Sequence, residues 1–447
     1  MKITQMEYIP ASKYLFLKIH TNEGITGIGE VGVWGYLDGA LGVLKKLEAY
    51  LIGQDPRRIE HHWQYMYRSM YFRGSIIMSA IAAVDIALWD IKGKALGVPV
   101  YELLGGKCRD KVRTYPAVFQ FTPEDMAKAC REIKAQGFTA ARLMITGDAR
   151  QRTCGPEESI FSSRISAQIE RVRACREAVG SDFDLILEIH RSMSVPDALA
   201  FAKGVEPYTP LFLEDPIAPD SDEVMAEIAV KTWLPIATGE RFITIQEFEN
   251  LLMKKAARYV RPDLCTMGGI TACKKVAAIA ESHYVDIVPH NPLGPVSTAA
   301  CLQLDAAVPN VCIQEFPSFY LSGGERDMIT SPLELDHGFL VVPDAPGIGI
   351  ELAEDLAERF PPAPRSIQCQ ISLTARCGIC RHRHKSRPGR AGFAMRCSRV
   401  PQAQPRPAGN FFSGRPLWHR PQKPYCLCAS VFCSSWIIWS ISITDST

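Results

Sequence analysis

Three apolar runs that each carry a glutamate near their end decide the fold: FDLILEIH at 183–190, LFLEDP at 211–216 and LPIATGE at 234–240. The glutamates, Glu188, Glu214 and Glu240, follow one another at intervals of 26 residues. One strand, one helix and two short loops fill about that length in a (β/α) barrel. If the runs are successive parallel strands, the three carboxylates meet at the carboxyl-terminal face of a barrel.

The rest of the chain agrees with this interpretation. From residue 113 to 338, strand-like runs alternate with amphipathic helical stretches, for example a helical pattern at 123–136 before a strand at 139–144. This alternation predicts an α/β fold with a parallel TIM-like barrel. Residues 1–112 predict an α+β domain, with a strand at 14–20 and helices at 41–51 and 79–96. Residues 339–365 look like a short C-terminal return segment.

Residues 366–447 differ in composition from everything before them. They carry a net charge of +11, which leaves −9 on residues 1–365 within a total of +2. They show no sustained helical or strand period, so we expect a disordered or non-native extension. Cys377, Cys380, His382 and His384 are too crowded for ordinary zinc spacing. The uncharged run at 426–443 is at the lower length limit for a membrane span. We therefore expect neither a zinc site nor a membrane anchor in this extension.

Charge and cysteine distribution exclude several classes of function. An acidic folded part argues against nucleic-acid binding. The eight cysteines before residue 366 show no framework spacing, which is typical of a reducing compartment. The N-terminus, MKITQMEYIP, lacks the apolar core of a signal peptide. We therefore expect a cytoplasmic protein that binds neither membranes nor nucleic acid.

Further polar residues stand at the ends of later strand candidates. Asp263 ends RYVRPD, His290 ends DIVPH and Glu315 ends VCIQE. His190 lies two residues after Glu188, so on a strand it would point to the same side. A single residue of this kind is usually a cap, a turn or a surface ion-pair partner. Their coincidence at one predicted rim indicates an active site.

The three glutamates imply a cation. Three anionic oxygens that aim at one point repel one another unless a hard cation lies among them. Carboxylate oxygens are the ligands that Mg²⁺ prefers. The sequence therefore predicts one Mg²⁺ held by Glu188, Glu214 and Glu240.

The chain resembles the enolase superfamily, in its mandelate racemase subgroup. The resemblance covers roughly residues 1–360 and is carried by SAIAAVDIALWDIKGKALGVPVYELLGG (79–106), LFLEDP, PIATGER, RPDLCTMGGITACKKVAAIAE and PHNPLGPVSTAACLQLDA. The last stretches look most like the galactonate dehydratase branch of acid-sugar dehydratases. The resemblance implies a (β/α)7β barrel, an N-terminal capping domain and a symmetric homo-oligomer.

The resemblance also implies roles for the residues singled out above. Glu188, Glu214 and Glu240 would hold the Mg²⁺. His290, paired with Asp263, would remove the proton α to the substrate carboxylate. Glu315 would hydrogen-bond the developing enediolate, which requires a protonated carboxyl and hence a pKa raised by burial. His190 would protonate the departing β-hydroxyl. These roles describe an Mg²⁺-dependent hydro-lyase that converts an aldonate, such as D-galactonate or D-gluconate, to a 2-keto-3-deoxy acid.

One departure from the subgroup narrows the reaction. Racemases carry Lys-x-Lys at the end of the second barrel strand, where this chain has Arg142-Leu-Met144. Arginine stays protonated and methionine is not a base, so two-base racemisation is not expected. Arg142 would instead hold a substrate oxygen or form a structural ion pair.

Three alternatives stay open. A mannonate dehydratase would pair Arg142 with a tyrosine, but 145–170 contains none. A one-base epimerase or isomerase would use the same scaffold, as would a non-catalytic acid-sugar-binding protein. The N-terminal domain would select the substrate through loop residues, for which Trp34, Tyr36 and Arg73 are candidates beside Phe72.

Overall fold

The computed structural model describes residues 1–146, 160–317 and 324–362, all of which belong to one compact unit. The predicted extension from residue 366, with its cysteine–histidine group and its apolar run, lies outside the described residues. Within the described ranges, no helix combines the length and apolar character that crossing a bilayer requires.

The N-terminal domain is an antiparallel sheet covered by helices. The strands pair in the order β1-β2-β3, and their bounds are Ile3–Ala11, Tyr14–Thr21 and Thr26–Glu30. The helices are α1 (Leu37–Leu51), α2 (Ile59–Arg68), α3 (Ser75–Leu96) and α4 (Val100–Leu104). Gly29 has no room for a side chain, because an added Cβ would overlap the backbone of Ala83 in α3. Glycine at this position therefore lets α3 lie directly against the sheet.

Seven parallel strands form the main sheet, in the order β11-β10-β9-β8-β7-β6-β5. Their bounds are Ala117–Val118 (β5), Ala140–Met144 (β6), Asp184–Glu188 (β7), Phe212–Glu214 (β8), Ile236–Thr238 (β9), Tyr259–Val260 (β10) and Asp286–Ile287 (β11). Strand β12 (Gln314–Glu315) pairs in parallel with β4 (Lys111–Tyr115), which directly precedes β5. The segment entering β12 also meets β11, because the amide of Cys312 donates to the carbonyl of Ile287 at 3.1 Å. The strands therefore close into the predicted barrel.

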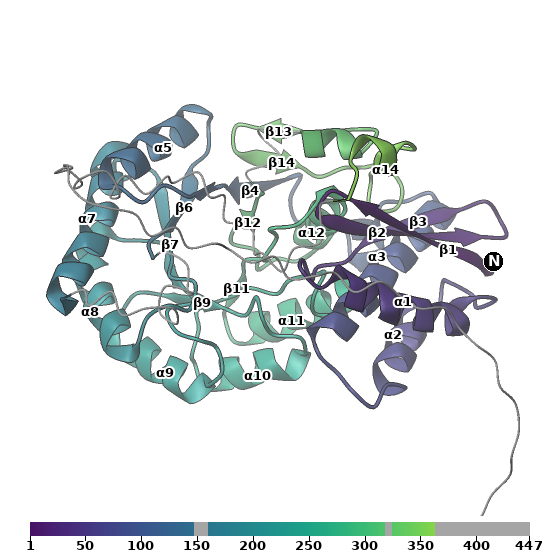
Figure 1. The fold of residues 1–447 in the computed structure, drawn as a ribbon, viewed down its shortest axis with the longest axis horizontal. Helices are drawn as coiled ribbons and strands as arrows, with labels where there is room; N and C mark the ends of the chain where they lie inside the picture. The colour runs from purple at the N-terminus through teal and green to yellow at the C-terminus, as the bar shows by residue number, and fades with distance from the viewer. Residues whose placement is uncertain (147–159, 318–323, 363–447) are drawn as a thin grey trace, which may run out of the picture. The chain divides into compact units, whose positions relative to one another are not determined.

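Helices surround these strands, and Figure 1 shows α5 and α7 to α11 as an outer arc. Their bounds are Pro123–Ala135 (α5), Phe161–Val179 (α7), Val195–Val205 (α8), Asp222–Lys231 (α9), Ile245–Met253 (α10), Gly269–Ser282 (α11) and Pro295–Ala307 (α12). Short 3₁₀ turns span Glu206–Tyr208 and Gly324–Met328. A capping box between Thr244 and Glu247 shows how local sequence sets a helix start. The helices predicted at 79–96 and 123–136 are confirmed, and the first begins four residues earlier than predicted.

The segment after the barrel returns to the N-terminal domain. Strand β14 (Phe339–Val341) pairs antiparallel with β4 and with β13 (Leu335–Asp336), and α14 spans Leu356–Arg359. The carbonyl of Phe360 accepts a hydrogen bond from the Ser12 amide at 2.9 Å. The seven described cysteines are all free.

Buried carboxyls of the N-terminal domain bind the first turns of barrel helices. Asp85 in α3 accepts hydrogen bonds from the amide and the hydroxyl of Thr271, at 3.0 and 2.6 Å, near the start of α11. Glu30, the last residue of β3, accepts from two amides near the start of α12. These contacts join the two domains because the amides at the start of a helix otherwise lack partners.

Asp85 makes the stability of the protein depend on pH near neutrality. Burial raises the pKa of Asp85 to about 7, above the value of the unfolded chain. The folded state then binds the proton of Asp85 more tightly than the unfolded chain does. The free energy of unfolding that this proton contributes is lost as pH rises through the folded pKa. We expect the free energy of unfolding of the wild type, relative to Asp85→Asn, to be about 1 kcal/mol or more higher at pH 5.5 than at pH 8. Urea denaturation at the two pH values measures this difference, and a difference that is constant with pH would contradict it.

Candidate active site

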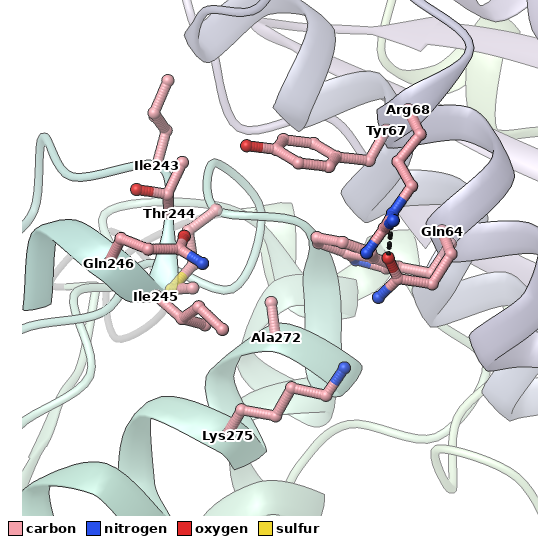
Figure 2. Close-up of a pocket in the computed structure, with 11 residues that line it drawn as sticks. Gln64, Tyr67, Arg68, Ile243, Thr244, Ile245, Gln246, Ala272 and Lys275 are labelled. Atoms are coloured by element: carbon pink, nitrogen blue, oxygen red, sulfur yellow. Dashed lines mark hydrogen bonds between the residues drawn. The ribbon is translucent and has the colours of Figure 1, made fainter. Parts of the chain in front are cut away.

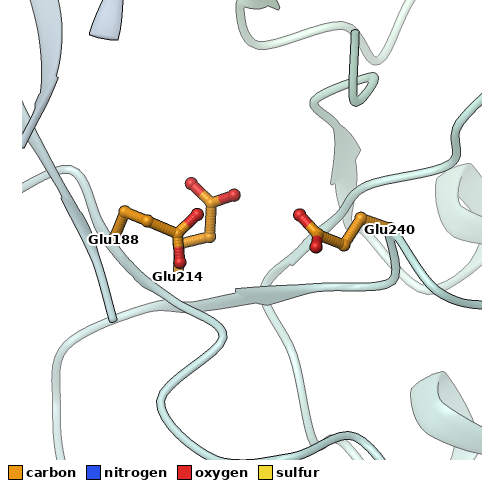
Figure 3. A group of neighbouring side chains, drawn as sticks. All are labelled: Glu188, Glu214 and Glu240. Atoms are coloured by element: carbon orange, nitrogen blue, oxygen red, sulfur yellow. The ribbon is translucent and has the colours of Figure 1, made fainter. Parts of the chain in front are cut away.

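Three glutamates meet at the carboxyl-terminal ends of neighbouring barrel strands. Glu188 ends β7, Glu214 ends β8, and Glu240 follows β9 by two residues. One carboxylate oxygen from each lies within 4.8 Å of the others (Figure 3). Gly239 has a φ of +130°, and an added Cβ would lie 2.6 Å from the ring of Phe248. Glycine at this position thus allows the turn that brings Glu240 towards its neighbours.

The donor set fits a hard divalent cation. All three ligands are carboxylates, and Glu188 and Glu214 are buried. Both oxygens of Glu214 are buried; Oε1 faces arginines, whereas Oε2 accepts no hydrogen bond from the described part of the chain. A buried oxygen without a hydrogen-bond donor is costly unless a positive charge compensates it. These residues are therefore suitable to bind a metal ion.

Three arginines compensate part of the negative charge. Nη1 of Arg142, at β6, lies 2.8 Å from Glu315, 3.5 Å from Glu214 and 3.6 Å from Glu188. Arg261, which is completely buried, contacts both Glu214 and Glu315. The third, Arg191, contacts Glu240 and lies 2.9 Å from Asp215, which also accepts from Thr238 at 2.6 Å.

Only Arg142 was a candidate from the sequence, whereas Arg191 and Arg261 were missed. Arg261 lies in RYVRPD, two residues before Asp263, on a strand candidate whose other residues are mostly apolar. An arginine inside an apolar strand run was the available signal, because such a charge is buried only when it is paired.

His290 and Asp263 form a buried pair beside the glutamates. Nδ1 of His290 lies 2.7 Å from Oδ2 of Asp263, and Nε2 lies 3.3 Å from Oε2 of Glu240. The other Asp263 oxygen accepts from the amide of Cys265 at 2.8 Å. Burial lowers the pKa of His290, but the charges of Glu240, Glu315 and Asp263 outweigh burial and raise it overall. The pair is therefore arranged as a base with its orienting carboxylate.

Glu315 lies in the cluster, but its predicted protonation was wrong. Burial raises the pKa of Glu315, as expected, yet the nearby Arg142, Arg261 and His290 lower it to about 2. Its Oε2 also accepts from the amide of Asn291 at 3.1 Å. The lowered pKa keeps Glu315 ionised near neutral pH, where it accepts hydrogen bonds and pairs with Arg142 rather than donating.

His190 lies at the site, although the strand argument that placed it there was wrong. Strand β7 ends at Glu188, and His190 has a left-handed φ of +53°, so strand alternation does not apply to it. Its amide donates to the carboxylate of Glu188. Burial lowers the pKa of His190, while the charges of Glu188 and Glu240 oppose that shift.

All four candidates from the N-terminal domain are exposed, and one of them, Trp34, lies near His290. The ring of Trp34 lies 6.2 Å from the ring of His290, measured between centroids. Tyr36, Phe72 and Arg73 are exposed. Among the described residues, no hydrogen bond or ion pair joins Tyr36 or Arg73 to the glutamates.

A cavity of about 150 Å³ lies elsewhere, between α2 and the starts of α10 and α11 (Figure 2). Its polar groups are mostly engaged: Lys275 lies 2.6 Å from Glu60, the Arg68 Nε donates to Gln64 at 2.9 Å, and the Trp63 indole donates to the Gly268 carbonyl at 2.7 Å. None of the residues predicted to act in the site lines this cavity. Its geometry indicates packing between the domains rather than catalysis.

Two family models match the chain. Residues 3–105 match the mandelate racemase / muconate lactonizing enzyme N-terminal domain, and residues 125–356 match the enolase C-terminal domain-like model. The two matches correspond to the N-terminal domain and the barrel.

The chain is also similar to known proteins along most of its length. It is 42% identical over 364 residues to a D-galactonate dehydratase of Verminephrobacter eiseniae, covering 80% of this chain and 93% of that protein. A D-galactonate dehydratase of Ralstonia pickettii is 41% identical over 373 residues, with 81% and 96% covered. The crystal structure of a member of the enolase superfamily from Salmonella Typhimurium is similar with a TM-score of 0.76 and 32% identity, covering 80% of this chain and 98% of that one.

The buried Arg261 provides a test of the charge balance. In protein kept in a chelator, Arg261→Met leaves Glu214 and Glu315 with one cation fewer in a buried place. We expect the free energy of unfolding to fall by about 3–5 kcal/mol, because one partner of a buried ion pair has been removed. Urea denaturation measures the loss. The control, Arg258→Met, removes an exposed guanidinium three residues away and should change stability by less than about 0.5 kcal/mol. A similar small loss in both variants would show that Arg261 does not balance the cluster.

Proposed function

The chain belongs to the mandelate racemase / muconate lactonizing enzyme family of the enolase superfamily and is a dehydratase, and we propose that its substrate is an acid sugar. The substrate class is an aldonate, such as D-galactonate or D-gluconate, and the product is the 2-keto-3-deoxy acid. The observation that carries the proposal is the buried His290–Asp263 pair, whose second ring nitrogen, Nε2, lies 3.3 Å from Glu240 of the acidic cluster. This arrangement supports a base that works beside a carboxylate-binding cation.

The acidic cluster is proposed to hold one Mg²⁺ through Glu188, Glu214 and Glu240. When bound, the ion supplies positive charge to the substrate carboxylate, which makes the neighbouring C–H more acidic. The family typically uses this metal, and the three convergent carboxylates support the assignment.

His290 is the proposed general base. Its Nε2 faces the cluster, while Asp263 holds Nδ1 and favours the tautomer with the free lone pair on Nε2. Nε2 accepts the C2 proton, and the electron pair of the broken C2–H bond moves into the substrate carboxylate. Asp263 stabilises the imidazolium that results, and the nearby glutamates act in the same direction because they raise the pKa of His290.

His190 is the proposed acid for the leaving group. The electron pair returns from the carboxylate to form the C2–C3 double bond as the C3–O bond breaks. A proton from His190 converts the departing hydroxide to water. The enol that remains takes the keto form, which completes the conversion to the 2-keto-3-deoxy acid.

Arg142 is proposed to bind the substrate carboxylate. Its guanidinium remains protonated, and Glu315 holds it at 2.8 Å on the side of the cluster. Donation from Arg142 stabilises negative charge as it develops on the substrate oxygens. Glu315 therefore acts by orienting Arg142, rather than by donating a hydrogen bond itself.

The same residues favour dehydration over racemisation. A two-base racemase needs a second base on the opposite face of C2, and β6 offers Arg142 and Met144 where such a base would stand. Neither side chain accepts a proton at neutral pH.

Trp34, whose ring lies near His290, is the proposed contact of the N-terminal domain with the substrate.

Proton NMR in D₂O with Mg²⁺, across a panel of aldonates and aldarates, tests the proposal. We expect a 2-keto-3-deoxy product from at least one aldonate. His290→Asn should lower turnover by about 10²-fold or more, because it removes the base. His283→Asn is the control, since this histidine lies at the end of α11 beside Glu249.

The panel also separates the alternatives. Exchange of the C2 proton without loss of water would identify an epimerase. Binding without either reaction would identify an acid-sugar-binding protein, and full activity in His290→Asn would contradict the assignment of the base.

Mg²⁺ binding is predicted to stabilise the fold. Because the ion binds only the folded site, a concentration of about 100 times its dissociation constant should add about 2.7 kcal/mol to the free energy of unfolding. Glu214→Gln should lose most of this gain, whereas Glu223→Gln, on the exposed side of α9, should keep it. Thermal denaturation with and without Mg²⁺ measures the effect. An equal response in the two variants would contradict the metal assignment.

A further inference from the structure

Glu30 connects the N-terminal domain to α12, the helix that follows the segment 288–294, which carries His290 and which we call the catalytic loop. It is the last residue of β3 and is completely buried. Its Oε1 accepts from the amide of Gly294 at 2.6 Å, and its Oε2 accepts from the amide of Ser297 at 2.9 Å. Both amides belong to the start of α12, where the helix has unpaired donors and a partial positive charge.

The N-terminal domain holds Glu30 in place from both sides. The amide of Val31 donates to the carbonyl of Leu15 in β2 at 3.0 Å. The amide of Gly32 donates to the hydroxyl of Ser79 in α3 at 2.7 Å. Glu30 is therefore fixed to the sheet and to α3, so its carboxylate is a rigid reference point for α12.

A chain of hydrogen bonds continues from this point to the catalytic loop. The hydroxyl of Ser297 donates to the side-chain carbonyl of Asn291 at 2.8 Å, and the amide group of the Asn291 side chain donates to Thr298 at 2.9 Å. Asn291 directly follows His290, and its backbone amide donates to Glu315 at 3.1 Å. These hydrogen bonds tie the start of α12 to Asn291, the residue next to the proposed base.

We propose that Glu30 is a positioning residue that sets the orientation of His290 from the N-terminal domain. The inference rests on the proposed function of His290 as the base. Trp34 lies in the turn that follows β3, and its ring is 6.2 Å from that of His290. The end of β3 therefore binds the start of α12, and the turn after it lies beside the imidazole of His290.

Asp85 offers a matched comparison. It is also a buried carboxyl of the N-terminal domain that binds the start of a barrel helix, through Thr271. The helix that it binds, α11, does not carry the network that contains Asn291. A purely structural contact between the domains would make the Glu30 and Asp85 variants behave alike.

The test compares Glu30→Gln with Asp85→Asn in the full chain. Both variants should lower the melting temperature. Only Glu30→Gln should lower kcat, by about 10- to 100-fold with KM within about twofold, because the base is misplaced while substrate contacts persist. The same rise in melting temperature with Mg²⁺ is expected in both, since neither residue is a proposed ligand.

A second measurement does not depend on turnover. The proton shared between His290 and Asp263 should give a downfield proton NMR signal, assigned by its loss in His290→Asn. We expect this signal to shift or broaden in Glu30→Gln and to stay in place in Asp85→Asn. If the signal responds in this way but no sugar is converted, the positioning role stands and the proposed function fails.

Ser297→Ala provides a milder variant should Glu30→Gln fold poorly. It keeps the two amides that bind Glu30 and removes the hydroxyl that reaches Asn291, so kcat should fall about threefold or more without a change in KM. The proposal is overturned if Glu30→Gln and Ser297→Ala keep both kcat and the downfield signal. It is equally overturned if Asp85→Asn loses as much kcat as Glu30→Gln.

Discussion

The balance of charge at the end of the barrel constrains the rest of the site. Four carboxylates, Glu188, Glu214, Glu240 and Glu315, converge where little water can separate them, and like charges in such a place repel strongly. Parallel strands bring these groups together through backbone hydrogen bonds, which do not depend on the charges. Positive charge that offsets the four carboxylates must then come from arginines and from a bound cation. The ionised state of Glu315 and the raised pKa of His290 both follow from this balance.

The sequence predicted the parts of the site that strand geometry determines. Equal intervals between Glu188, Glu214 and Glu240 predicted that the three would meet, and they lie within 4.8 Å of one another. Strand ends likewise predicted that His290 and Asp263 would lie at the same rim, and the resemblance implied their pairing; the atoms are 2.7 Å apart. Parallel strands of a barrel end at one face, so position along the chain translates directly into position in space. The family matches agree with this fold.

Features that depend on contacts between distant side chains escaped prediction. Glu315 was expected to be protonated because burial alone raises a carboxyl pKa, but the arginines reverse the shift. The apolar run around Arg261 signals a buried arginine, but nothing local identifies Glu214 as its partner, because the two residues belong to different strand candidates. His190 takes a left-handed conformation that is uncommon outside glycine, so the alternation rule failed there. Glu30 is 264 residues away from Gly294 in sequence, a separation that no periodic pattern records.

The return of the chain to its starting domain has a consequence for biosynthesis. The amide of Val100 pairs with the carbonyl of Gly347, Asp90 accepts from the amide of Ile348, and Ser12 pairs with Phe360. A ribosome makes the first partner of each pair long before the second. The N-terminal domain must therefore wait, with these groups unpaired, until almost the whole barrel has emerged from the exit tunnel. The last contacts of the N-terminal domain therefore form late in synthesis, after the barrel has been made, so the two domains complete their folding together rather than one after the other.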